Sequence, residues 1–185
     1  MATTYKPRTA YLLIGSNQGD RKAFLAQAID KIGRNVGRVR EKSKLYETQA
    51  WGVTNQPDFL NQAIAVETAL NAHNVLTEIQ NIEKEMGRTR TQKWAERTID
   101  IDILLFDDIV VKSPTLTIPH PELAKRNFAL IPLMEIAGEV EHPILNLTIE
   151  EIYFDCNDPL EVYLLDEKWN RLQLSKSFKL LESLR

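Results

Sequence analysis

The sequence predicts an α+β fold with one antiparallel sheet, and two observations lead to that prediction. Four stretches have the apolar run or two-residue alternation of strands: 10–14, 36–46, 59–68 and 97–106. Two stretches have the spacing of amphipathic helices: 20–32, and 71 or 74 to 86. The order strand–helix–strand–strand–helix–strand is that of the split β-α-β, or ferredoxin-like, arrangement. We therefore expect helices on one face of the sheet, plus C-terminal additions.

The ends of the two helices follow from capping residues. Asp20 is expected to cap the first helix and Gly33 to end it. Asn71 or Asn74 is expected to begin the second, and Gly87 to stop it. Both helices then connect strands of the same sheet.

The remaining segments have weaker patterns. A polar loop is expected at 48–58, and a hairpin is expected to pair 109–111 back after the turn at Asp107 and Asp108. Helices are expected further along the chain, at 122–126, 128–137 and 149–154. We expect one domain over 1–154, with 155–185 as a C-terminal extension of unknown role packed on it.

Composition limits the class of protein. The chain of 185 residues has 43% hydrophobic and 26% charged residues, as ordinary globular proteins do. Its single cysteine excludes an internal disulfide framework, and no run reaches the roughly 20 apolar residues of a membrane span. We find no secretory signal, so a cytoplasmic protein is expected. A monomer is also expected. The net charge of −3 argues against non-specific nucleic-acid binding.

The stretch from Arg97 to Phe106 carries the strongest chemical signal. Its alternation places Asp100 and Asp102 on one strand face, roughly 6.5 Å apart at Cα. Two like charges on a mostly buried strand require neutralisation by cations or metal. Carboxylate oxygens suit Mg²⁺, especially Mg²⁺ that also binds substrate phosphates. The alternative is a solvated edge strand with two exposed aspartates, although aspartate is depleted in strands.

A basic stretch from Gly87 to Arg97 precedes this strand. It holds three arginines and a lysine, whereas the whole chain is mildly acidic. Arginine offers forked donors that match phosphate oxygens. Basic side chains beside a metal-binding aspartate pair are typical of phosphoryl or nucleotidyl transfer.

Other candidates are ambiguous by spacing alone. Phe59 and Asn61 share a strand face and could hold a flat heterocycle, but a core Phe and a turn Asn are favoured. Gln80 and Glu83 are more typical of a solvated helix face. His120, between two prolines, is either an ordinary loop residue or a phosphate donor.

Taken together, the motifs resemble a known family. They are, in chain order, Ile14-Gly15-Ser16-Asn17, Tyr46-Glu47-Thr48, Gln56-Pro57-Asp58-Phe59-Leu60-Asn61, Gly87-Arg88-Thr89-Arg90, Trp94 to Leu104, and Ile118-Pro119-His120-Pro121 with Arg126 and Phe128. Residues 10 to about 154 are similar to the 6-hydroxymethyl-7,8-dihydropterin pyrophosphokinases (2-amino-4-hydroxy-6-hydroxymethyldihydropteridine diphosphokinases). The combination of the Arg-x-x-Asp-Ile-Asp motif, which begins at Arg97, with the earlier Gln-Pro-Asp-Phe-Leu-Asn is very specific in this order and spacing.

The resemblance implies an enzyme, a Mg²⁺-dependent diphosphotransferase. It would transfer the β,γ-pyrophosphoryl unit of ATP to the pterin hydroxymethyl group and release AMP, in folate biosynthesis. Two Mg²⁺ ions would bind Asp100 and Asp102, and Arg88 and Arg97 would assist the transfer. Asp100 is the candidate if a general base takes part.

The same resemblance implies two sets of binding residues. Residues at nucleotide-contacting positions are Gln80, Glu83, Arg90, Ile103, Thr117, His120 and Arg126. Residues at pterin positions are Thr48, Phe59, Asn61, Trp94 and Phe128. The two aromatic residues Trp94 and Phe128 would enclose the ring, and Asn61 would bind its edge.

Two other functions remain open from the residues themselves. A two-metal nucleotidyltransferase or phosphohydrolase of similar fold would use the aspartate pair and the arginines. It would not need the aromatic and amide residues together. A non-catalytic ferredoxin-like binding module would have no use for the aspartates beside the arginines.

Overall fold

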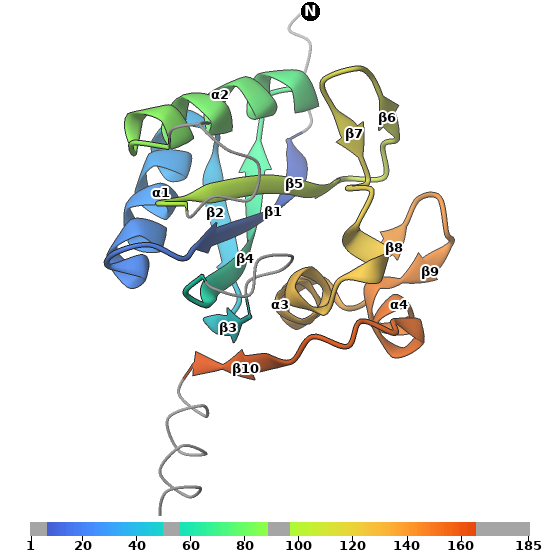
Figure 1. Cartoon of the computed structure of the whole chain (residues 1–185). Helices are drawn as coiled ribbons and strands as arrows, with labels where there is room; N and C mark the ends of the chain where they lie inside the picture. The colour runs from blue at the N-terminus through green and yellow to red at the C-terminus, as the bar shows by residue number, and fades with distance from the viewer. Residues whose placement is uncertain (1–6, 50–55, 89–96, 166–185) are drawn as a thin grey trace, which may run out of the picture.

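A computed structural model describes residues 7–49, 56–88 and 97–165 (Figure 1). The first part of the chain forms β1 (Arg8–Ser16), α1 (Arg21–Asn35), β2 (Arg38–Lys42), β3 (Tyr46–Thr48), β4 (Phe59–Thr68), α2 (Ala72–Glu85) and β5 (Asp100–Phe106). The second part forms β6 (Val111–Lys112), β7 (Thr117–Ile118), the 3-10 helix η1 (Leu123–Lys125), α3 (Asn127–Ala137), β8 (Glu141–His142), β9 (Leu147–Thr148), α4 (Ile149–Asp155) and β10 (Val162–Leu164).

One antiparallel sheet organises the molecule, which confirms the predicted α+β class. Its strand order is β10-β3-β4-β1-β5, and β2 also pairs with β4. Neighbouring strands are antiparallel at every pairing described. The long central strands β1 and β4 therefore connect the carboxylate-bearing β5 to the β2 and β3 side of the sheet (Figure 1).

The prediction of one continuous strand over 36–46 is wrong. The chain forms β2 and β3 on either side of Ser43, which bonds to β4 through both its backbone and its side chain. Its N–H donates to the Ala63 carbonyl (2.9 Å), while its Oγ accepts from the Ala63 N–H (3.0 Å). These bonds take the place of regular pairing at this point. The pairing resumes in β3, which includes Thr48, a residue predicted to be in a loop.

The predicted helix starts are confirmed, and one predicted end is wrong. Asp20 accepts from the Ala23 N–H (3.0 Å) and Asn71 accepts from the Asn74 N–H (2.9 Å). Helix α1 runs through Gly33 to Asn35, and the chain turns at Gly37 instead. A Cβ on Gly37 would lie 2.2 Å from the Glu67 carbonyl oxygen, so only glycine fits that crossing.

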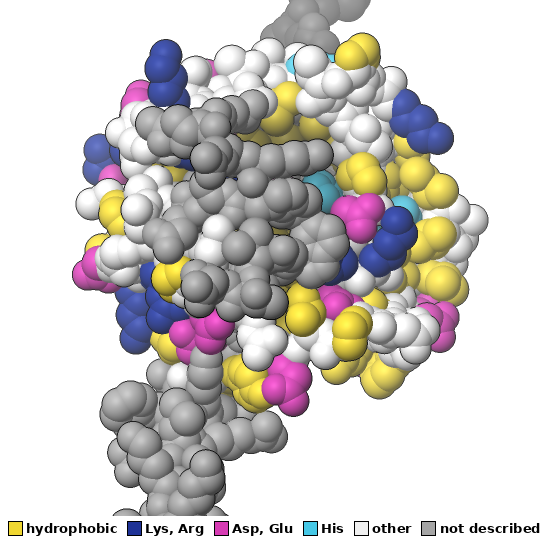
Figure 2. Space-filling view, in the orientation of Figure 1, with side chains coloured by type: hydrophobic (Ala, Val, Ile, Leu, Met, Phe, Trp, Pro, Cys, Tyr) yellow, Lys and Arg dark blue, Asp and Glu magenta, His cyan; other side chains and the backbone are white. Residues whose placement is uncertain are grey.

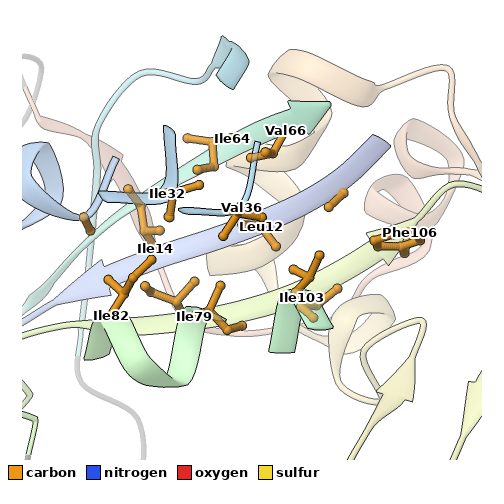
Figure 3. Packing of buried hydrophobic residues seen from close by; sticks show 14 of the residues in the cluster. Leu12, Ile14, Ile32, Val36, Ile64, Val66, Ile79, Ile82, Ile103 and Phe106 are labelled. Atoms are coloured by element: carbon orange, nitrogen blue, oxygen red, sulfur yellow. The ribbon is translucent and has the colours of Figure 1, made fainter. Parts of the chain in front are cut away.

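Helices α1 and α2 cover one face of the sheet. Their apolar side chains meet the inward-facing residues of β1, β4 and β5 in a cluster that includes Leu12, Ile14, Ile32, Val36, Ile64, Val66, Ile79, Ile82, Ile103 and Phe106 (Figure 3). These positions alternate along the strands and recur at helical spacing along α1 and α2. The sequence pattern therefore fixes which side of each element is buried.

The expectation that helices cover only one face is wrong. Leu13, Ala63 and Leu104, which point to the other face, pack in a second cluster with α3 and α4. Helix α3 is apolar nearly all round, since it holds Phe128, Ala129, Leu130, Ile131, Pro132, Leu133, Met134, Ile136 and Ala137. A helix with so little polar surface needs burial, and this sheet face supplies it.

The predicted hairpin of 109–111 with the preceding strand is also wrong. Asp107 adopts a positive φ of 44° and accepts from the Thr9 N–H (2.7 Å), which ends β5 against β1. Strand β6 pairs with β7 instead. Beyond α4, strand β10 pairs with β3 at the edge of the main sheet. None of the described helices has the length and apolar character needed to cross a membrane.

Candidate active site

A cavity of about 510 Å³ lies on the sheet face that α3 covers only in part. Its lining residues come from β1, β3, β4 and β5, from residues that flank β3, β4 and β5, and from the segment around the start of α3: Leu13, Gly15, Thr48, Gln49, Gln56, Phe59, Asn61, Arg97, Asp100, Asp102, His120, Glu122, Arg126 and Phe128. Acidic and basic side chains are interspersed on the face of the molecule seen in Figure 2, and hydrophobic ones gather toward α4, β8 and β9.

The register of three strands builds the floor of the cavity. In β1, Gly15 pairs with Asn61 of β4 on one side and with Asp100 of β5 on the other. Leu13 pairs in the same way with Ala63 and Asp102. Strands lie about 4.8 Å apart, so Asn61 and Asp100 are about 10 Å apart across the sheet. A glycine between them leaves this space open.

Asp100 lies between two arginines. Its Oδ1 is 2.6 Å from Arg88 Nη1, and its Oδ2 pairs with Arg97 Nη1. The side chains are largely buried, with 16% of Asp100 and of Arg88 and 29% of Arg97 exposed. Two guanidinium groups therefore converge on one carboxylate at the edge of the cavity.

Asp102 has a different environment. Among the residues described, it makes no ion pair. Burial, together with the nearby Asp100, raises its pKa from 3.8 to about 6, against the opposing effects of His120, Arg88 and Arg97. Asp102 is therefore an acidic group at which added positive charge would be favourable.

Glu83 is buried on α2, beneath Asp100 and Asp102. Its Oε1 accepts from the Ile101 N–H (2.8 Å) and pairs with Arg88. Burial raises its pKa to about 7 against the opposing effects of Arg88 and of the backbone hydrogen bond. Glu83 thus joins the edge strand β5 to Arg88 and does not line the cavity.

The other end of the cavity combines an amide with aromatic side chains. Asn61 Nδ2 donates to Thr48 Oγ1 (2.9 Å), and both residues are buried. This bond fixes the Asn61 amide beside Phe59, which faces the same cavity. Across from them, the guanidinium carbon of Arg126 lies 5.0 Å from the centre of the Phe128 ring.

The structure brings together nine of the residues predicted for the site. Those lining the cavity are Thr48, Phe59, Asn61, Arg97, Asp100, Asp102, His120, Arg126 and Phe128. Arg88 joins them through Asp100. Gln80 is exposed on α2, Thr117 is exposed on β7, and the Ile103 side chain packs in the α1–α2 core. Arg90 and Trp94 lie outside the described residues.

Asn17 is a contributor that residue spacing does not identify. The residue is buried, and its Oδ1 accepts from the Arg97 N–H (2.7 Å). Its Nδ2 lies 3.4 Å from both Gln56 Oε1 and the Pro57 carbonyl oxygen. Asn17 therefore ties the backbone of Arg97 to the segment that leads into Phe59. Only its position in a family motif could have indicated this role.

The carboxylates suit a hard divalent cation whose remaining ligands are supplied by a substrate and water. Within the described ranges, no group of three or more His, Cys, Asp and Glu side chains is arranged to hold a metal. Two neighbouring carboxylates remain, Asp100 and Asp102. Mg²⁺ is commonly bound by one or two carboxylates with substrate phosphates and water completing its shell.

The fold and the cavity define a class: an antiparallel α+β protein whose cavity joins a carboxylate–arginine cluster to an aromatic and amide wall. The family model for 7,8-dihydro-6-hydroxymethylpterin-pyrophosphokinase (HPPK) matches residues 11–138. The chain belongs to this family.

Relatives in bacteria are similar over most of their length. The 2-amino-4-hydroxy-6-hydroxymethyldihydropteridine pyrophosphokinase of Aquifex aeolicus is 43% identical over 143 residues, 77% of this chain and 89% of the relative. The Bacillus subtilis enzyme of the same name is 42% identical over 133 residues, 71% of this chain and 80% of the relative.

Solved structures share the fold at lower identity. The crystal structure of a Plasmodium falciparum HPPK-DHPS triple mutant with SDX-DHP aligns with a TM-score of 0.65 at 21% identity, over 83% of this chain. The alignment spans 45% of that longer chain.

Proposed function

We propose that the chain transfers the β,γ-pyrophosphoryl unit of ATP to the hydroxymethyl group of 6-hydroxymethyl-7,8-dihydropterin, giving the pterin diphosphate and AMP in folate biosynthesis. The observation that carries this proposal is that one cavity combines the carboxylate–arginine cluster with the aromatic and amide side chains. The strand register brings Asn61, Gly15 and Asp100 into one row across β4, β1 and β5. The relatives' names are those of this reaction.

The aromatic and amide end would bind the pterin. A flat heterocycle gains from contact with ring faces, and a buried amide held by one hydrogen bond can offer its remaining polar atoms to the ring edge. Phe59 and Phe128 would supply the ring contacts, and Asn61, oriented by Thr48, would bind the edge. Trp94 stays a prediction for the second ring face.

The arginine end would bind the phosphates. Arg88 and Arg97 converge beside Asp100, and each guanidinium has five N–H donors to share between a carboxylate and phosphate oxygens. As the attacking hydroxyl oxygen bonds to the β-phosphorus, the bond from that phosphorus to the α-phosphate oxygen breaks and AMP leaves. Positive side chains fixed before the reaction stabilise the charge that develops.

Asp100 and Asp102 would hold the two Mg²⁺ ions. When bound, the ions would neutralise phosphate charge and lower the pKa of the attacking hydroxyl. His120 and Arg126 line the same cavity and would contact ATP. Nucleotide contacts by Gln80, Glu83, Arg90, Ile103 and Thr117 stay predictions. In this structure Glu83 bonds to Arg88 and Ile101, which supports an indirect role for it.

The wider organisation is part of the same proposal. The strand order β5-β1-β4-β2, with α1 and α2 as the crossovers, supports the ferredoxin-like arrangement. The monomeric state stays a prediction. The division into a 1–154 domain and a 155–185 extension, and the cytoplasmic location, stay predictions.

The test compares Asp102 of β5 with Asp108 of the turn that follows β5. Asp102→Asn removes a carboxylate from the cavity and should lower pterin-dependent AMP formation at least about a hundredfold. Asp108→Asn removes an exposed carboxylate a few residues along and should leave the rate unchanged. Circular dichroism checks that both variants fold. Undiminished turnover by Asp102→Asn would refute the metal assignment, and ATP hydrolysis without pterin dependence would favour the phosphohydrolase alternative.

A further inference from the structure

We infer that Asp158, which follows the 11–138 span of the family match, is a positioning residue for one wall of the substrate cavity. It fixes the Arg126 side chain and the first turn of α3, and through them the Phe128 ring. The inference rests on the proposed function and deepens it. It gives part of the C-terminal segment a role in substrate binding.

Apart from one hydrogen bond within its own loop, the hydrogen bonds described for Asp158 lie at the start of α3. Its Oδ2 accepts from the Arg126 Nε (3.3 Å) and from the Asn127 N–H (3.0 Å). The Asn127 Nδ2 donates in return to the Asp158 carbonyl oxygen (3.1 Å). Its Oδ1 accepts from the Leu160 N–H (3.2 Å), which holds the carboxylate in its own loop.

Burial makes this ion pair sensitive to change. Only 9% of the Arg126 side chain and 5% of the Asp158 side chain are exposed. A buried charge whose partner is removed is strongly unfavourable, so Asp158 determines where the guanidinium can lie. Surface pairs such as Lys125–Glu122, with side chains 67% and 52% exposed, impose no such constraint.

Asp158 also supplies a cap that α3 does not provide for itself. The residue before α3 is Arg126, which makes no capping hydrogen bond with its own side chain. A carboxylate at the first N–H of a helix satisfies a donor that the helix leaves free and interacts favourably with the helix dipole. Asp158 does this from 31 residues further along the chain.

The wall that results faces the substrate. Arg126 and Phe128 both line the cavity, and the guanidinium lies 5.0 Å from the ring centre. The chain after Asp158 continues into β10, where Val162 pairs with Thr48 of β3. One short segment therefore contacts the elements that carry both Phe128 and Thr48, on two sides of the cavity.

The test measures substrate affinity in the full chain. Asp158→Ala should raise the KM for ATP and weaken binding of 6-hydroxymethylpterin, followed by its own fluorescence, each about tenfold, with kcat changed less than about threefold. Asp158→Asn keeps an acceptor for the Asn127 N–H but loses the charge, so its effect should be intermediate. Asp155→Asn, an exposed aspartate in the same segment, is the control and should bind both substrates as the wild type does.

A double-mutant cycle separates positioning from simple loss of stability. In an Arg126→Ala background, Asp158→Asn should cause no further loss of ATP affinity, because the group that it positions is gone. Wild-type affinity in a folded Asp158→Ala protein, or equal additional loss in the Arg126→Ala background, would overturn the inference alone. Failure of the wild-type protein to form AMP would overturn the proposed function instead, and the inference with it.

Discussion

Asp100 and Asp102 are two residues apart on one strand face, yet they have different environments. Asp100 is neutralised by Arg88 and Arg97, whereas Asp102 is half-buried near another carboxylate and has no ion pair among the described residues. The raised pKa of Asp102 follows from this difference. Asp102 is therefore, with Glu83, one of two acidic groups through which the metal-free site responds to pH.

This difference predicts how stability depends on pH. Folding raises the pKa of Asp102 from 3.8 to about 6, so its contribution to stability is fully present below about pH 4 and is lost as the pH rises through 6. The free energy of unfolding of the wild type should therefore fall relative to that of Asp102→Asn, by roughly 1–3 kcal/mol, between pH 4 and pH 8.

Urea denaturation in EDTA, without nucleotide, measures the difference at each pH. Asp108→Asn corrects for the general loss of one negative charge. A constant difference between wild type and Asp102→Asn across this range would show that burial does not perturb Asp102.

At the scale of elements, β1 acts as a spacer between the two ends of the cavity. Gly15 lies between Asn61 and Asp100 in the sheet register, and a Cβ there would be 2.6 Å from Asn61 Oδ1. A larger residue would displace the amide that Thr48 orients. The absence of a side chain at Gly15 therefore leaves room for the Asn61 amide.

Gly15→Ala tests this role. Overpacking typically costs 1–3 kcal/mol, so binding of 6-hydroxymethylpterin should weaken about tenfold while ATP binding changes less. Gly33→Ala is the matched control, since it lies in α1 with no atom within 4 Å of the added Cβ. It should leave binding intact and raise stability by about 0.5–1 kcal/mol. Unchanged pterin binding by Gly15→Ala would contradict the spacer role.

Local patterns predicted which face each element presents, but not which partners end or divide it. Alternation placed Asp100 with Asp102 and Phe59 with Asn61 correctly, because the two-residue period is a property of the strand itself. The break at Ser43 and the turn at Gly37 after α1 depend on contacts with Ala63 and Glu67 of β4. No pattern within the segment carries that information.

At the scale of the whole molecule, the sheet is covered on both faces, and the site lies where the second cover ends. Helices α1 and α2 fill one face, while α3 and α4 cover the other only up to Leu13 and Ala63. Beyond them the same face forms the floor of the cavity. The sequence predicted the first core but not the second, because α3 has no polar stripe to show how it is oriented.

Contacts between distant parts of the chain account for the site residues that spacing could not identify. Asn17 binds the Arg97 N–H, Glu83 binds the Ile101 N–H, and Asp158 binds Arg126, and each pair joins a group that lines or supports the cavity to another segment. The chemistry-bearing residues could be predicted from residue type and motif. The residues that hold them in place became visible only once the fold brought the segments together.

The central claim is that the β-phosphorus of ATP is the atom attacked, and following that phosphorus tests it most directly. The protein is incubated with Mg²⁺, 6-hydroxymethyl-7,8-dihydropterin and ATP labelled at the β-phosphorus, and the products are separated. We expect the label in a pterin diphosphate and an equal amount of unlabelled AMP, both formed only when the pterin is present. Label retained in ADP would mean that the γ-phosphorus is attacked and would contradict the account.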